Sequence, residues 1–441
     1  RDRDDALAAH LRTGRDLEGC GHVRPRRDAA RDAFELGEAP VKNNYEIRLA
    51  SNNLNADSLS VSLGFAGILP RVFASASTNN STQSSSQLRA DGTEIELDGA
   101  KNNNKSYGVG LDWTIFDGLS MFARYDQLKE LRKLGEAELK STILNRVSDV
   151  MITYYDLVQQ QQQLTALDST IVISQQRVDL ADNRFSIGKA SKLEVLNAQV
   201  DLNTDRTLFL RQKELYANTK IRLNEILARD TKIDFKVDDD VLINDNLVLT
   251  DLEILATKQN PELQAQLINK RIAELELKQI KGNRYPTITA NTGYNFSDSE
   301  STLGFARLNN SRGWNYGFSA SVDIFNGSNQ NRNEKIAKMQ LDNSAIAIEQ
   351  QTQTIKAQLN TAFQTYLTNV GLVDLEANNE EIAKENLDIT LAKYNIGTIP
   401  TIEFRTAQLN YINAKLRLSA AKYQAKLSEI TLKQLAGNLS L

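Results

Sequence analysis

The fold of this 441-residue chain is decided by one stretch, Ser106-Tyr107-Gly108-Val109-Gly110-Leu111-Asp112-Trp113-Thr114-Ile115-Phe116-Asp117-Gly118. Every second position holds a large apolar side chain, and the positions between them hold small or polar ones. The apolar set is Tyr107, Val109, Leu111, Trp113 and Ile115. Strict alternation predicts a β-strand with two different faces. Such a strand suits a barrel wall that faces lipid, and it also suits a sandwich strand that faces a protein core.

The same pattern returns in the second half of the chain. There the apolar positions are Trp314, Tyr316, Phe318, Val322 and Ile324, with Ala320 among them. A third alternating run covers 288–296, and a weaker one covers 71–78. The sequence therefore predicts four strands.

The two halves are copies of one plan, and repeats of this kind are sought before anything else. Ile115-Phe116-Asp117-Gly118 returns as Ile324-Phe325-Asn326-Gly327, an offset of 209 residues. Asn44-Tyr45-Glu46-Ile47 resembles Asn260-Pro261-Glu262-Leu263 at an offset of 216 residues. The offset changes once, in a stretch rich in Ser and Asn after Pro70, which predicts a longer loop in the first copy.

Each copy reads as a helix, two strands, a very long helix, a turn and a long helix. We assign an atypical leader of uncertain origin to residues 1–38, the first repeat to 39–229, an acidic linker to 230–258 and the second repeat to 259–441. The fold class is mainly α with a β-barrel contribution.

Very long helices follow the strands of each copy. No proline interrupts the chain between Pro70 and Pro261, and a continuous helix of about 70 residues would reach roughly 100 Å. Leu164, Leu167, Ile171, Ser174, Val178, Ala181 and Phe185 form a heptad seam of the kind that packs helices side by side. Gly188 and Gly397 fit the position just past a helix end, where the chain reverses.

Four strands cannot close a barrel, since membrane barrels begin at about eight strands. A sheet in lipid must have no open edge, because every backbone N–H and C=O needs a partner there. The strands must therefore be pooled among chains. Two chains would give eight strands and three would give twelve.

Composition excludes several classes of function. The net charge of -4 offers no basic field for nucleic acid. Both histidines and the single cysteine lie within the first 22 residues, so the repeats lack Ser-His, Cys-His and zinc-type constellations. We expect no catalytic residues, no metal, no cofactor and no enzyme activity.

The chain from about residue 40 to its end resembles the TolC-like outer membrane efflux proteins. The resemblance rests on the duplication, on the strand ends quoted above and on two tip motifs. The first motif is Arg184-Phe185-Ser186-Ile187-Gly188 followed by 193–199, and the second is Lys393-Tyr394-Asn395-Ile396-Gly397 followed by 402–408.

This resemblance implies a homotrimer in the outer membrane of a Gram-negative bacterium. Three chains would form a twelve-stranded β-barrel in outer-membrane lipid, continued by an α-helical barrel in the periplasm. The channel would conduct small molecules or polypeptides passively, in a tripartite efflux or type I secretion system. Its partners would be a periplasmic adaptor, also called a membrane fusion protein, and an inner-membrane pump of RND or ABC type. Ile187, Gly188, Ile396 and Gly397 would contact the adaptor.

The resemblance also implies a gate at the periplasmic entrance. Glu403 matches the first of two acidic positions that narrow this entrance in the family, whereas Thr406 occupies the second. Glu194 matches a position that helps to hold the entrance shut. Ile399 stands where a basic partner is expected, which weakens that network here. The alternative for both glutamates is an ordinary solvated helix face.

Two other functions stay open on sequence grounds. A coiled-coil scaffold outside the membrane would explain the helices but not the aromatic strands. A diffusion porin independent of any pump would explain the strands but does not need helices of roughly 100 Å.

Overall fold

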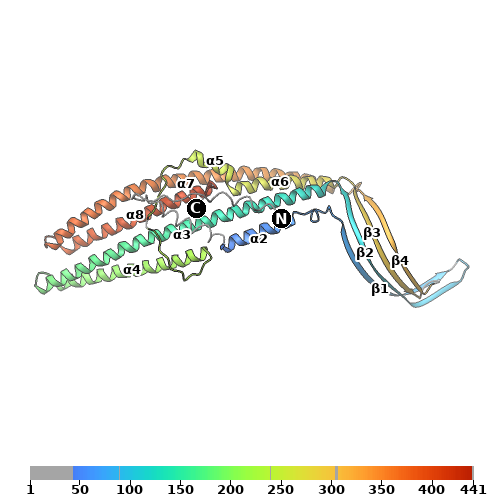
Figure 1. The fold of residues 1–441 in the computed structure, drawn as a ribbon, viewed down its shortest axis with the longest axis horizontal. Coiled ribbons are helices and arrows are strands. Elements are labelled where there is room, and N and C mark those ends of the chain that lie inside the picture. The colour runs from blue at the N-terminus through green and yellow to red at the C-terminus, as the bar shows by residue number, and fades with distance from the viewer. Residues whose placement is uncertain (1–42, 89, 239, 303–305, 440–441) are drawn as a thin grey trace, which may run out of the picture.

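The computed structural model describes residues 43–88, 90–238, 240–302 and 306–439 of the chain. The leader predicted for residues 1–38 lies outside the described residues. The molecule is elongated, with a curved sheet at one end and the tips of two helical hairpins at the other (Figure 1). Its elements are α2 (Tyr45–Ser60), β1 (Arg71–Leu88), β2 (Glu94–Asp117), α3 (Ser120–Ser186), α4 (Lys192–Ile226), α5 (Leu249–Gln259), α6 (Pro261–Gly282), β3 (Thr287–Ser301), β4 (Leu308–Ser321), α7 (Asn329–Asn395) and α8 (Thr401–Leu435).

The long helices of the two halves have equal lengths. The long helices α3 and α7 each contain 67 residues, and α4 and α8 each contain 35. A helix of 67 residues spans about 100 Å. Both hairpins, α3–α4 and α7–α8, therefore carry their turns to the same end of the molecule (Figure 1). Among the described residues, no helix combines the length and the apolar character needed to cross a membrane.

Two asparagines join helices end to end at equivalent places. The Asn44 side chain accepts hydrogen bonds from the backbone N–H groups of Glu46 and Ile47, and its amide donates to the carbonyl of Ile226 at 2.7 Å. Asn260 repeats this between α6 and α8, donating to the carbonyl of Leu435 at 2.9 Å. One side chain thus caps the start of one helix and the end of another. As a result α2 extends the line of α4, and α6 extends the line of α8.

The four strands form one antiparallel sheet in the order β1-β2-β3-β4. Tyr107 pairs with Phe296, and Tyr294 pairs with both Val109 and Trp314. Directly paired residues share a face, so most apolar positions of the four strands lie on one side of the sheet. The large side chains on this side are exposed in the single chain, with Tyr316 at 85% and Phe318 at 79%. Phe73, which pairs with Gly110, lies on the other side.

Three expectations about the strands need correction. Ile115 is the extra residue of a bulge, so Phe116 rather than Ile115 pairs with Ile288. β4 ends at Ser321, and Val322 and Ile324 therefore lie beyond the lipid-facing strand to which we assigned them. The pairing stops there because the partner strand begins at Thr287, directly after Pro286, which has no N–H to donate.

The Ser/Asn-rich stretch is not the predicted loop. β1 continues to Leu88 and β2 begins at Glu94, so the two strands form a hairpin whose pairing runs up to Leu88 and Glu94. β3 pairs with β2 only from Asn102 onward. The hairpin therefore projects beyond the rest of the sheet as a two-stranded ribbon (Figure 1). The Ser- and Asn-rich rows of this hairpin are polar on both faces, so their side chains carry no alternation from which a strand could be predicted.

Candidate functional site

The two turns at the helical tips have the same backbone geometry. Gly188 and Gly397 adopt left-handed conformations with φ of 74° and 81°. The N–H of Gly188 donates to Phe185 O at 2.9 Å, and the N–H of Gly397 donates to Tyr394 O at 3.0 Å. A positive φ strains any residue with a Cβ. At Gly397 a Cβ would also come within 2.5 Å of the Arg184 guanidinium, so a larger residue there would displace the end of this flexible side chain.

Apolar side chains stand in solvent beside both turns. Ile187 and Ile396 directly precede the glycines and are 67% and 77% exposed. Leu193 and Ile402, at the starts of α4 and α8, are 65% and 71% exposed. The residues predicted to contact an adaptor thus lie at the outermost end of the helices, as an exposed apolar set on a polar molecule.

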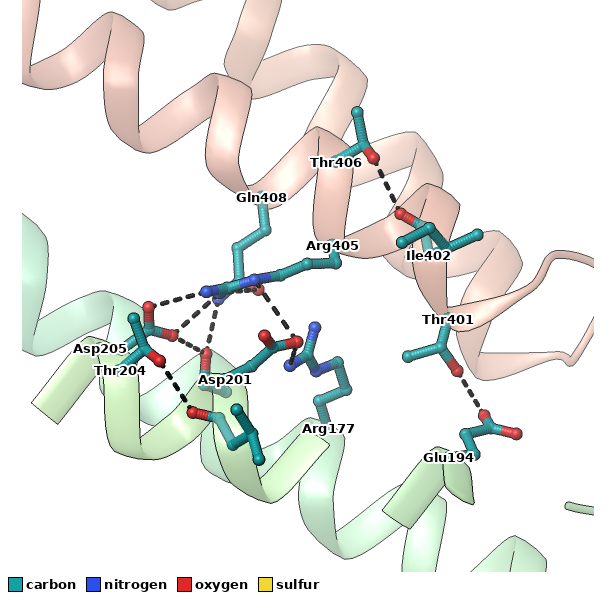
Figure 2. A network of polar contacts seen from close by, with 12 residues as sticks. Arg177, Glu194, Asp201, Thr204, Asp205, Thr401, Ile402, Arg405, Thr406 and Gln408 are labelled. Atoms are coloured by element: carbon teal, nitrogen blue, oxygen red, sulfur yellow. Dashed lines mark hydrogen bonds and ion pairs between the residues drawn. The ribbon is translucent and has the colours of Figure 1, made fainter. Parts of the chain in front are cut away.

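Glu194 does contact the other hairpin, although not through a basic residue. Its carboxylate accepts a hydrogen bond from the Thr401 hydroxyl at the start of α8 (Figure 2). Tyr394 lies 3.4 Å from the same hydroxyl and stacks on Phe404 with ring centroids 5.0 Å apart. The Arg184 guanidinium lies 5.3 Å from the centre of the Tyr394 ring. An aromatic and hydroxyl contact therefore joins the two tips where Ile399 supplies no charge.

Glu403 lies apart from this contact. It is exposed on the first turn of α8. Thr406 is exposed one turn later, and its hydroxyl donates to Ile402 O of its own helix at 2.9 Å. The structure therefore brings Glu194 to the joint between the hairpins and leaves Glu403 facing away from it.

Above the tips, a buried ionic network joins the hairpins more strongly. Both carboxylate oxygens of Asp205 on α4 accept hydrogen bonds from Arg405 on α8, each at 2.9 Å (Figure 2). Arg405 is 8% exposed and Asp205 is 2% exposed. This two-point geometry is the strongest form of an arginine–carboxylate contact. Water screens it little, because both groups are buried.

Four further side chains complete the network. Ser174 on α3 donates to Asp205, and the Gln408 amide donates to the Ser174 hydroxyl at 3.0 Å. Arg177 on α3, which is 1% exposed, donates to Asp201 on α4, and this carboxylate lies 3.7 Å from Arg405. Two arginines and two aspartates from three helices thus neutralise one another. Removal of a single partner would leave a buried charge, which costs about 3–5 kcal/mol.

Sequence reasoning missed this network, which we call the arginine clasp (Arg177, Asp201, Asp205 and Arg405). We treated the missing base at 399 as a weakness, whereas the clasp provides Arg405 further along α8. A signal was present in the repeat. At the offset of 209, Arg405 of the second copy corresponds to Leu196, and Asp205 of the first copy corresponds to Ala414. At each of these two positions, one copy therefore has a charged residue where the other has an apolar one.

Over the described ranges, no group of three or more His, Cys, Asp or Glu side chains is placed to hold a metal ion. The clasp joins two hairpins, and the exposed apolar set can meet another protein.

Comparison with known proteins agrees with this geometry. A sequence model of the family described as outer membrane efflux protein matches residues 38–229 and 254–438. The outer membrane protein TolC of Escherichia coli is 20% identical over 360 residues, which are 78% of this chain and 72% of that protein. The toluene efflux pump outer membrane protein TtgC of Pseudomonas putida is 21% identical over 413 residues, which are 91% of this chain and 82% of that protein.

A solved structure shows the same fold. The CmeC outer membrane channel of Campylobacter jejuni superposes with a TM-score of 0.74 at 18% identity, covering 93% of this chain and 86% of that one. The fold that the two chains share is a pair of elongated helical hairpins that ends in a sheet. The chain belongs to the outer membrane efflux protein family. Its place is accordingly the outer membrane, and its role is in efflux.

Proposed function

We propose that three copies of this chain form one passive channel from the periplasm to the exterior. Their sheets form a twelve-stranded barrel, and their helices continue it as a tunnel through the periplasm. The observation that carries this proposal is the open sheet: β1 and β4 lie at its two edges. An apolar sheet in lipid cannot leave these backbone groups unpaired, so β4 of one copy pairs with β1 of the next.

The height of the apolar face fits a membrane. It runs along β2 from Tyr107 to Phe116, about 30 Å at roughly 3.4 Å per residue. Strands in membrane barrels tilt by about 35–45°, which reduces this to roughly 23 Å across the membrane, close to the ~25 Å apolar band of such barrels.

The tips supply the contact with a periplasmic adaptor. Ile187 and Ile396 present apolar surface, and Gly188 and Gly397 hold the turns that expose it. An inner-membrane pump of RND or ABC type supplies the energy, in a tripartite efflux or type I secretion system. The conducted substrates are small molecules or polypeptides.

The clasp and the Glu194–Thr401 contact keep the entrance narrow. Both join the α3–α4 hairpin to the α7–α8 hairpin of one copy, so the hairpins cannot part until these contacts break. Glu403 is exposed on α8 and places a carboxylate of each copy at the entrance.

The mass of the detergent-solubilised complex tests the assembly. We expect three times the chain mass of 49.3 kDa, and ion conductance after insertion into a planar lipid bilayer. A water-soluble monomer would refute the proposal, as would a dimer in the conducting state.

A further inference from the structure

A cluster of aromatic side chains closes the apolar face at the end away from the helices. Tyr107 stacks on Phe296 at 5.0 Å, Phe296 meets Tyr294 at 5.1 Å, and Tyr294 meets Trp314 at 5.3 Å, all between ring centroids. Aromatic residues of this kind mark the level where hydrocarbon gives way to headgroups. Because the helices lie at the opposite end of the sheet (Figure 1), this cluster lies at the outer leaflet in the proposed channel.

Charged side chains follow the aromatic cluster, and only on the same face. Lys105 lies two residues beyond Tyr107, Lys101 lies four residues further along, and Arg312 pairs directly with Phe296. All three are exposed. The carboxylates of this face are Asp298, which pairs with Lys105, and Glu300, which lies 3.8 Å from Arg307. Counting Arg307, four cations stand against two carboxylates.

The opposite face is uncharged over the same rows. Its positions are Ser77, Asn79, Ser81, Asn102, Asn104, Ser106, Ser297, Ser299, Ser301, Asn309 and Ser311. Charged residues that served only to solvate the strands would be expected on both faces of the sheet. The segregation therefore points to a partner on the outside of the sheet.

The position of Lys105 and Arg312 relative to the hydrocarbon boundary identifies the partner. Two residues of a strand advance about 7 Å, so the Lys105 ammonium lies just past the hydrocarbon boundary that Tyr107 marks. Arg312 lies level with that boundary, and arginine matches phosphate with two parallel hydrogen bonds. Lipid phosphates lie at this level.

We propose that Lys105 and Arg312 bind the phosphates of a phosphorylated glycolipid in the outer leaflet, and that Lys101, further from the membrane along β2, adds positive charge to the same site. The inference rests on the proposed channel, because it needs the apolar face to lie in lipid. Asp298 reduces the local positive charge and limits the number of phosphates held. Three copies would carry three such sites around the outside of the barrel.

Lipid binding to the detergent-solubilised complex tests the proposal. Bis-phosphorylated lipid A is titrated in, and bound lipid is counted by native mass spectrometry, with dephosphorylated lipid A as the second probe. Each basic residue near such a surface contributes about fivefold in affinity. We therefore expect Lys101→Ser/Lys105→Ser/Arg312→Ser to bind the phosphorylated probe at least tenfold more weakly, with no change for the dephosphorylated one.

Two matched variants sharpen the result. Asp298→Asn removes a carboxylate from the same face, and binding should strengthen several-fold. Lys129→Ser/Lys133→Ser removes two exposed charges from α3, and binding should not change. Equal binding by the parent and the triple variant would overturn the inference, as would equal binding of the two probes. The same spectra report the number of chains per complex, so a trimer that fails the lipid test leaves the proposed channel standing.

Discussion

At the scale of single residues, the arginine clasp shows how a duplicated chain gains an asymmetric function. Asp205 and Arg405 occupy positions where the other copy has Ala414 and Leu196. Apolar residues at those positions contribute packing alone. The ionic pair stabilises the contact only when both partners are present, because removal of one leaves the other as an uncompensated buried charge. The clasp is therefore a joint that breaks as a unit.

The other copy supplies the matched substitutions for a test. Arg405→Leu leaves Asp205 buried without its two hydrogen bonds from Arg405, and we expect the free energy of unfolding to fall by about 3–5 kcal/mol. Arg405→Leu/Asp205→Ala removes both charges and should recover at least half of this loss. Denaturant titration of the detergent-solubilised protein measures both. A double variant less stable than the single one would contradict this account.

Glu403 carries a separate prediction, which concerns ions rather than stability. In the proposed channel, the exposed Glu403 carboxylates of three copies would lie at a narrow entrance and concentrate cations there. Glu403→Ala should weaken the block of single-channel conductance by divalent cations several-fold and leave the unfolding curve unchanged. Glu380→Ala, on the long helix α7, serves as the control. Identical block in the parent and Glu403→Ala would discard the gate role of Glu403.

At the scale of elements, the linker after α4 is held against α8 by one buried carboxylate. Glu429 is 2% exposed, and it accepts hydrogen bonds from Lys433 at 2.6 Å, from Lys426 at 3.0 Å and from the backbone N–H of Asn244 at 3.2 Å. Lys426 also donates to Leu242 O at 2.9 Å, and the Tyr366 hydroxyl donates to Asn244 O at 2.5 Å. Polar contacts thus dock a segment that has little regular structure.

This carboxylate predicts an acid-sensitive joint. Burial disfavours the charged form of Glu429, but Lys433 and Lys426 outweigh burial and hold its pKa below the ordinary value of 4.5. A lowered pKa contributes stability above the ordinary value, and that contribution is lost as the pH falls through the pKa of the folded state. We therefore expect loss of linker protection below about pH 4.5 in hydrogen exchange. Glu429→Gln should lack this acid step, and an unchanged step would contradict the assignment.

The sequence predicted the elements whose side chains follow a regular pattern, and it did not predict those without one. Alternation located β2 and β4, and the absence of proline together with the tip glycines located the long helices. The ribbon beyond Asn102 is largely polar, and the alternation of Ile95 and Leu97 with acidic residues is the main trace that its backbone pairing leaves in the side chains. The clasp joins residues 200 positions apart, and no local pattern relates positions so distant in the chain.

At the scale of the whole molecule, the sheet does two separable tasks. The rows nearer the helices pair across all four strands. The rows from Ala100 and Gln83 to the hairpin end pair only between β1 and β2. Closure of the proposed barrel depends on the rows that pair across all four strands. The ribbon adds surface outside the membrane and no pairing with β3.

A shortened ribbon tests this division. Replacing residues 84–99 by a two-residue Asn-Gly turn between the paired Gln83 and Ala100, a turn that suits tight hairpins, should leave the mass of the complex and its conductance unchanged. Mass measurement and planar bilayer recording in parallel would show this. Loss of the trimer would mean that the ribbon takes part in assembly.

The equal lengths of the paired helices restrict how such a molecule can change. Seven residues inserted into α3 and α4 alone would push one hairpin about 10 Å past the other. Asp205 would then no longer face Arg405, and the partner protein would meet an uneven rim. Homologues adapted to a wider periplasm must therefore carry insertions of equal size in all four long helices.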